Sequence, residues 1–190
     1  KHFERVALVV RVAGYVVAYP CLWDQSLWSV QVDFLTVIVG RRAAAPTALQ
    51  MFGVFYFAAG FWKLNTAFMN WRLSCATILM VQLLPEKMMP AVLVGALARA
   101  APALTAFGEI ALGVALVVAG SPRRTSYRRL ARRVGVVLTA ALHLGICLAP
   151  YPNQITNFSV FCLSRVLFCA LPATAPRAAL ELVGKIGSGK

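Results

Sequence analysis

The sequence predicts an all-α fold, a polytopic transmembrane helical bundle of about six to eight helices. Of its 190 residues, 60% are hydrophobic and only 13% are charged, whereas about half of the residues of a soluble domain are apolar. The apolar residues form long segments between prolines, glycines and charges, as helices that cross a membrane do. A crossing needs roughly 20 helical residues. Segments of about 12 to 18 residues must therefore extend into their flanks or fail to cross.

Breakers and charges delimit eight apolar segments in chain order. They are Val6 to Tyr19, Leu27 to Val39, Thr47 to Leu64, Leu73 to Leu84, Met88 to Ala101, Ala103 to Gly120, Val134 to Ala149 and Thr156 to Leu171. Residues 73–101 are expected to cross twice or to form a re-entrant hairpin. Because no repeat or linker divides the chain, residues 1–190 are expected to form a single transmembrane domain with a basic loop at 121–133 and a basic tail at 173–190. The start at Lys1 rather than methionine indicates a processed or incomplete product.

The net charge of +13 comes from basic residues that lie between apolar segments, which favours a topological role over binding of nucleic acid. With eight crossings, most basic residues and both termini fall on one side. Six arginines lie between positions 123 and 133, and Arg128, Arg129 and Arg132 among them are candidates to contact anionic lipid head groups or an acidic partner subunit. The alternative is a simple topology anchor.

Small residues also mark one helix surface. Ala111, Ala115 and Ala119 are spaced at i, i+4 and i+8, a stripe along which another helix can approach closely.

Seven ionisable residues lie inside the apolar segments: Arg11, Asp33, Lys63, Arg99, Glu109, His143 and Arg165. A charge in lipid costs several kcal/mol, so each is expected to face a neighbour, a cavity or the interface. Candidate ion pairs are Arg11 with Asp33, and Glu109 with Arg165. Structural pairing is the leading interpretation, and Glu109 is also a candidate for contact with a pigment or lipid.

His143 is a lone imidazole in an apolar helix. Neutral imidazole can ligate a metal, including the magnesium of chlorophyll, but a hydrogen-bonded core histidine is commoner. The five cysteines show no CxxC and no paired Cys/His spacing, which disfavours a protein metal site.

Catalysis, if present, depends on Lys63, because the sequence carries no catalytic triad, carboxylate pair, P-loop or dinucleotide fingerprint. A lysine partly desolvated in an apolar site loses its proton more readily and can act as a base. The alternative is an interfacial lysine that snorkels beside Trp62 and Trp71.

The run from Phe55 to Asn65, FYFAAGFWKLN, resembles the "Y-F-x-A-G-x-x-K-L" segment of the HTTM membrane domain. This family includes vitamin K-dependent gamma-carboxylase, and the resemblance spans roughly Tyr19 to Pro172. It implies that Lys63 is the base that deprotonates vitamin K hydroquinone. The chain departs from the carboxylase at Asn65, where the family has an acidic residue, and the residues after Pro172 are too few for its large lumenal domain.

These observations lead us to expect a non-catalytic transmembrane accessory subunit of a larger membrane complex, with other membrane subunits and lipids as partners. Similarity to algal members of the family suggests a photosynthetic supercomplex of the thylakoid membrane, with chlorophyll, carotenoid or lipid as the bound group. The alternative is a carboxylase-like enzyme that uses Lys63 on a quinone-like or lipid substrate. A transporter has less support, because no internal repeat is visible.

Overall fold

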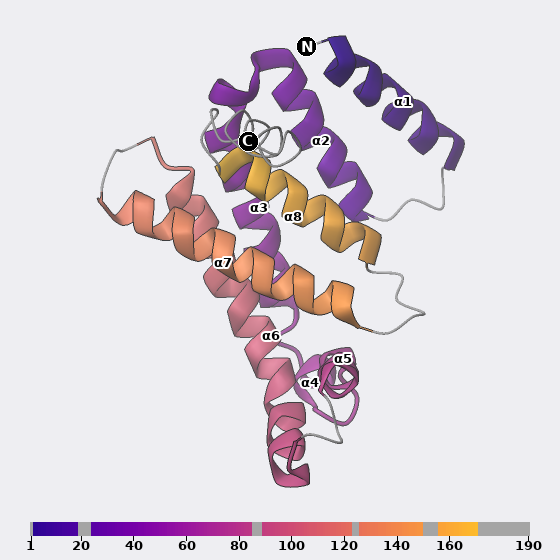
Figure 1. The fold of residues 1–190 in the computed structure, drawn as a ribbon, viewed down its shortest axis with the longest axis vertical. Coiled ribbons are helices and arrows are strands. Elements are labelled where there is room, and N and C mark those ends of the chain that lie inside the picture. The colour runs from indigo at the N-terminus through magenta and orange to yellow at the C-terminus, as the bar shows by residue number, and fades with distance from the viewer. Residues whose placement is uncertain (1, 19–23, 85–88, 123–125, 150–155, 171–190) are drawn as a thin grey trace, which may run out of the picture.

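The structure, a computed structural model, describes residues 2–18, 24–84, 89–122, 126–149 and 156–170 (Figure 1). Within these ranges every regular element is a helix, which confirms the all-α prediction. In chain order the helices are α1 (His2–Ala18), α2 (Asp24–Val39), α3 (Arg41–Trp62), α4 (Thr66–Met69), α5 (Cys75–Leu83), α6 (Ala91–Ala119), α7 (Ser126–Leu148) and α8 (Thr156–Ala170). The predicted basic tail lies outside the described residues, and the second half of the predicted basic loop belongs to α7.

Three helices, α3, α6 and α7, are long and apolar enough to cross a membrane. They contain 22, 29 and 23 residues, which gives lengths of about 33, 43 and 35 Å at 1.5 Å per residue. The other long helices, α1, α2 and α8, have 17, 16 and 15 residues, fewer than the roughly 20 that a perpendicular crossing needs. The molecule is therefore an integral membrane protein by helix length and composition, with three clear candidate spans.

The prediction of separate helices on either side of Pro102 is wrong, because α6 continues through this proline. A proline within a helix lacks the N–H that would bond to the carbonyl four residues earlier, here that of Ala98. The Thr77 hydroxyl of α5 donates to this carbonyl at 3.1 Å. Hydroxyl side chains commonly satisfy carbonyls that prolines free in membrane helices. Thr77 thus compensates for the break and ties α5 to α6.

Gly40 is the single residue between α2 and α3, and it has a φ of +81°. This backbone conformation is readily adopted by glycine but disfavoured for residues with a Cβ. Its amide donates to the Thr36 carbonyl at 3.0 Å and its carbonyl accepts from Ala44 at 2.9 Å. The two helices are therefore joined by a very tight reversal.

Glycines allow α3 and α6 to pack backbone against backbone. A Cβ added at Gly113 would lie 2.5 Å from the Phe57 nitrogen and 2.6 Å from the Gly53 oxygen, and one at Gly60 would lie 2.6 Å from the Ala106 oxygen. Real Cβ atoms essentially never approach this closely. The α3–α6 interface consequently requires glycine at these positions.

The alanine stripe predicted on α6 is only partly buried. Ala115 and Ala119 lie in the core, whereas Ala111 is exposed. Two glycines approach the backbone of α3 closely: Gly113, between Ala111 and Ala115 in the sequence, and Gly120, directly after Ala119.

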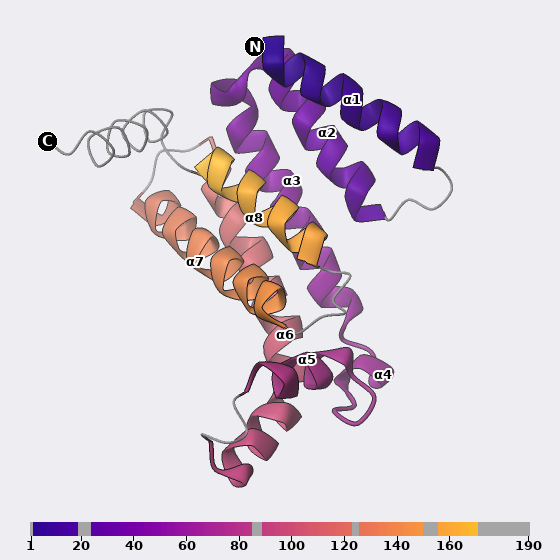
Figure 2. The same cartoon turned by 45° about the vertical axis from the view of Figure 1, so that its right-hand side comes forward.

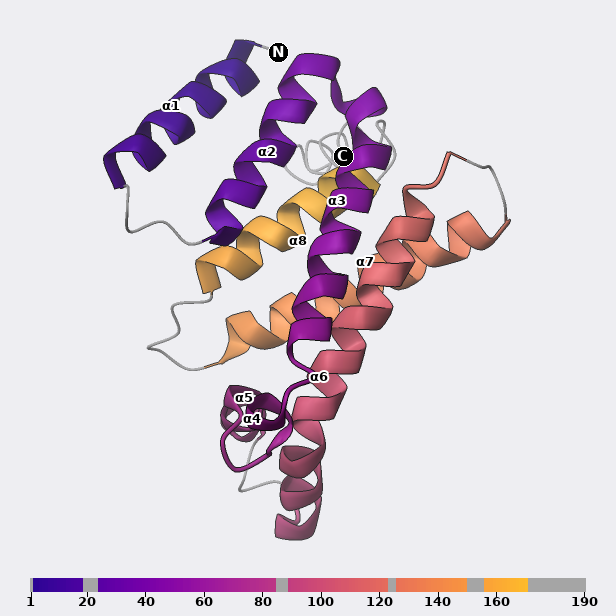
Figure 3. The same cartoon turned by 180° about the vertical axis from the view of Figure 1, so that it is seen from behind.

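Successive long helices alternate in direction, and α7 and α8 lie across the upper half of the α3–α6 pair (Figures 1 and 2). The core combines side chains of α2, α3, α6 and α8, with Phe52, Leu116 and Val166 almost completely buried. The N-terminal half of α6 extends away from this bundle, and among the described helices α4 and α5 lie beside it, as seen from behind in Figure 3.

Candidate functional site

Lys63 lies where α3 ends against the middle of α6. Its Nζ is 2.5 Å from the Glu109 Oε2 and 3.5 Å from the Ala59 carbonyl oxygen. The Lys63 and Glu109 side chains are 26% and 11% exposed. The ammonium also lies 5.7 Å from the centroid of the Phe68 ring, a cation–π contact. Lys63 thus occupies a largely enclosed site in which its charge is neutralised.

Local sequence explains this position. Gly60, one turn before Lys63, lets α3 approach the backbone of α6 near Ala106. A cation at the C-terminal end of a helix is also favoured by the helix dipole. Just beyond, Asn65 accepts a bond from the Phe68 amide at 2.9 Å and donates to the Trp62 carbonyl at 2.7 Å. Asn65 therefore begins α4 and holds the end of α3.

Tyr56 and His143 form a second polar contact between α3 and α7. Both side chains are almost completely buried, and the Tyr56 hydroxyl is hydrogen-bonded to His143 Nε2. The imidazole therefore takes the hydrogen-bonded core position that the sequence offered as the alternative to ligation. Tyr56 was not singled out as a functional candidate, although it precedes Lys63 by two helical turns on the same face of α3.

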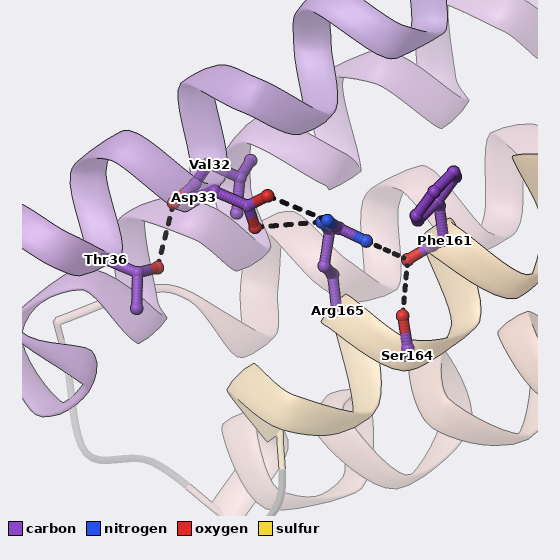
Figure 4. A network of polar contacts seen from close by, with 6 residues as sticks. All are labelled: Val32, Asp33, Thr36, Phe161, Ser164 and Arg165. Carbon is purple, nitrogen blue, oxygen red and sulfur yellow. Dashed lines mark hydrogen bonds and ion pairs between the residues drawn. The ribbon is translucent and has the colours of Figure 1, made fainter. Parts of the chain in front are cut away.

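Arg165 and Asp33 join α8 to α2 (Figure 4). Arg165 donates from Nη2 at 2.8 Å and from Nε at 3.0 Å to the two carboxylate oxygens of Asp33. Its Nη1 donates to the Phe161 carbonyl at 3.2 Å, and the guanidinium lies 4.9 Å from the Phe161 ring centroid. This bidentate geometry is typical of a strong, directional arginine–carboxylate pair.

The predicted pairing of Glu109 with Arg165 is wrong, because each residue pairs with a different helix. Glu109 lies on α6 opposite the end of α3, whereas Arg165 lies on α8 opposite α2. For the other predicted pair, the side chain of Arg11 lies outside the described residues. Ion pairing is the correct general interpretation of Lys63, Glu109, Asp33 and Arg165, but helix spacing did not identify the partners.

The arginine candidates lie on the first turns of α7. Arg128 Nε donates to the Ala119 carbonyl at the end of α6 at 3.0 Å. Arg129 is exposed and Arg132 is half-buried. These three residues therefore lie near the C-terminal end of α6, about three helical turns from Glu109 along that helix.

Trp71 lies beside two arginines, Arg72 and Arg99, whose proximity the sequence did not predict. The Arg72 and Arg99 guanidinium groups lie 5.4 and 5.6 Å from its ring centroid. Trp71 is 39% exposed. Arg99, predicted inside an apolar segment, therefore has an aromatic partner near the α4–α5 turn.

The buried polar side chains of these sites form links between helices. The ion pairs and the Tyr56–His143 contact each join two different helices. Among the described residues, no group of three or more His, Cys, Asp or Glu side chains is arranged to hold a metal ion. Among the paired polar side chains described above, the sequence suggested a proton-transfer role for Lys63.

Comparison of the chain with protein-family models, with curated proteins and with solved structures finds no match.

Proposed function

We propose that this chain is a non-catalytic transmembrane subunit of a larger membrane assembly, built on an HTTM-like helical bundle. The observation that carries the proposal is the use of Lys63. Its ammonium forms an ion pair with Glu109 across the α3–α6 interface. The candidate catalytic group therefore holds two helices together.

The region around α4 and α5 supports a need for neighbouring subunits. Residues 70–74 interrupt the helical backbone beside α6, and α5 has only nine residues. Non-helical backbone is tolerated at membrane depth only where protein or a water-filled cavity surrounds it. The N-terminal part of α6 also exposes Val92 and Leu93, which are 86% and 45% accessible. A neighbouring subunit at this surface would cover both features.

In this proposal all six long helices cross the membrane. The short helices α1, α2 and α8 would cross with little tilt, where the bilayer is locally thinner or where partner subunits surround them. Similarity to algal members of the HTTM family makes a photosynthetic supercomplex of the thylakoid membrane the first assembly to test. In that assembly chlorophyll, carotenoid or lipid would contact the exposed apolar helix faces.

The test is gentle solubilisation of native membranes, native electrophoresis, and location of the chain by mass spectrometry together with absorption spectra. We expect co-migration with a large pigmented or redox complex. Val92→Asn should weaken this association, whereas Val17→Asn should not. Val17 is equally exposed at 86% but belongs to α1, a helix that lies on the opposite side of the bundle from α5 (Figure 1). Migration of the wild-type chain alone, near its own mass plus detergent, would contradict the subunit proposal.

A carboxylase-like enzyme is the second candidate, favoured by the remaining 26% exposure of the Lys63 side chain. A substrate that reached the exposed part of the Lys63 side chain would contact its ammonium group. Glu109 is placed to accept a proton from this ammonium group. In this case Lys63→Ala should abolish turnover of vitamin K hydroquinone, and Arg72→Ala, which removes a nearby cation, should retain it. Full turnover by Lys63→Ala would exclude the lysine as the base.

A further inference from the structure

Four arginines, Arg128, Arg129, Arg132 and Arg133, lie on the first two turns of α7. We infer that this group, here called the α7 arginine cluster, together with the end of α6, binds the head group of an anionic phospholipid. The α7 arginine cluster is separate from the Lys63–Glu109 site at the middle of α6. Lipid binding at this cluster does not depend on the proposed subunit function.

The cluster is held in place by the neighbouring helix end. Arg128 Nε donates to the Ala119 carbonyl of α6 at 3.0 Å. Arg132 Nε is buried and has no hydrogen-bond partner in the structure. A buried charged donor without an acceptor is costly, and a phosphate oxygen is the acceptor that a guanidinium binds best. Arg132 is half-buried as a whole, and a phosphate that entered between α7 and its neighbours would supply the missing acceptor.

Three members of the cluster, Arg129, Arg132 and Arg133, carry charge that the described carboxylates do not neutralise. Asp33 and Glu109 are the acidic residues whose side chains the structure describes, and they pair with Arg165 and Lys63. Arg42, near the start of α3, is exposed at the same end of the bundle, since Pro46 of α3 contacts Gly120 of α6. A positive field thus covers this end, and basic groups beside a membrane attract anionic lipid surfaces.

An exposed apolar surface adjoins the arginines. Leu130, Val134 and Val137 are 60%, 40% and 64% exposed on the following turns of α7, and Tyr127 at its start is 74% exposed. Exposed tyrosine beside basic residues and before an apolar helix is typical of the membrane–water boundary. A surface with a basic part and an adjoining apolar part matches an amphiphile with an anionic head group and acyl chains. An acidic soluble protein would use only the basic part.

The test uses the full-length chain in mild detergent with two probes that share the same acyl chains, phosphatidylglycerol and phosphatidylcholine. Retention of lipid adducts in native mass spectrometry and the shift in melting temperature both report binding. We expect phosphatidylglycerol to bind at least tenfold more tightly than phosphatidylcholine. The double variant Arg129→Gln/Arg132→Gln should lose about 25-fold in affinity for phosphatidylglycerol, about fivefold per arginine.

The matched control is Arg72→Gln/Arg99→Gln, which removes the same charge near the α4–α5 turn and should retain binding. Equal binding of the two lipids, or equal losses in both double variants, would overturn the inference. If polyglutamate or glycerol phosphate displaced the lipid at the same concentration, the ligand would instead be a soluble anion. If the α7 variant fails to fold, the wild-type chain still provides a test. Its preference for phosphatidylglycerol should fall steeply as salt rises from about 50 to about 500 mM, because screening weakens contacts between exposed charges. A preference that does not depend on salt would contradict the inference.

Discussion

Lys63 and Glu109 show how a charge is accommodated inside this bundle. The two groups come from helices that approach closely at Gly60, and their ion pair lies beside an aromatic ring rather than in open solvent. Composition and position identified both residues as costly at membrane depth. Their pairing could not be predicted, because it depends on the register between α3 and α6, which is set by backbone contacts rather than by spacing within either helix.

Replacement of Glu109 by Gln should destabilise the protein by about 3 kcal/mol, because it leaves the ammonium of Lys63 enclosed without its counter-ion. Equilibrium unfolding in mixed micelles with increasing denaturing detergent measures this change. Addition of Lys63→Met to the same chain should recover most of the loss, since the double variant contains no unpaired charge. Unchanged stability in Glu109→Gln would show that the pair contributes nothing to folding.

The helices themselves were predictable where the signal is local. The end of α2 at Val39 and the end of α6 next to Gly120 agree with the breakers in the sequence. Pro102 was misleading, because its effect on a helix depends on a distant donor. Thr77 lies 21 residues before Ala98 and donates to the Ala98 carbonyl, which the proline leaves without its usual helical donor. The helix continues through the proline. The short α4 was also missed, since its start depends on the side-chain bonds of Asn65.

The contact between α3 and α6 makes a sharp prediction about glycine. Gly113→Ala should destabilise the protein by about 1 to 3 kcal/mol, because the new methyl group would overlap the backbone of α3 and force the helices apart. Thermal unfolding in detergent checks this. Gly108→Ala on the same helix is the matched control, since a Cβ there meets nothing within 4 Å. It should be neutral or slightly stabilising, as alanine has the higher helix propensity. Equal effects of the two substitutions would rule out the close-packing explanation.

The complete molecule combines a compact upper bundle with a protruding half-helix. Hydropathy identified a membrane protein and its all-α class, because both follow from composition and periodicity. The arrangement of α4 and α5 beside the lower half of α6 could not be predicted, because it rests on tertiary contacts such as the bond from Thr77 to Ala98. The candidate residues were therefore found, whereas the way in which they group into pairs was not.

If α6 crosses the membrane, the loops at its two ends must lie on opposite sides. Cysteines introduced at Pro90, directly before α6, and at Ser121, directly after it, in a chain whose native cysteines are replaced by alanine, should react with an impermeant thiol reagent from opposite faces of sealed membranes. Ser121 should face the side on which the protein is made, because the adjacent α7 arginine cluster favours that side. Labelling of both positions from the same face would exclude this topology.

The Asp33–Arg165 pair has a consequence for the order of biosynthesis. Its partners are 132 residues apart in the chain, so a ribosome that adds about 5–20 residues per second reaches the arginine on the order of 10 s after the aspartate. The bond from Thr77 to Ala98 spans only 21 residues and is available within a few seconds. The bond from Thr77 to α6 can therefore form before the ion pair that joins α2 to α8. A transcript truncated before α8 would yield a chain without Arg165, in which Asp33 on α2 lacks this ion-pair partner.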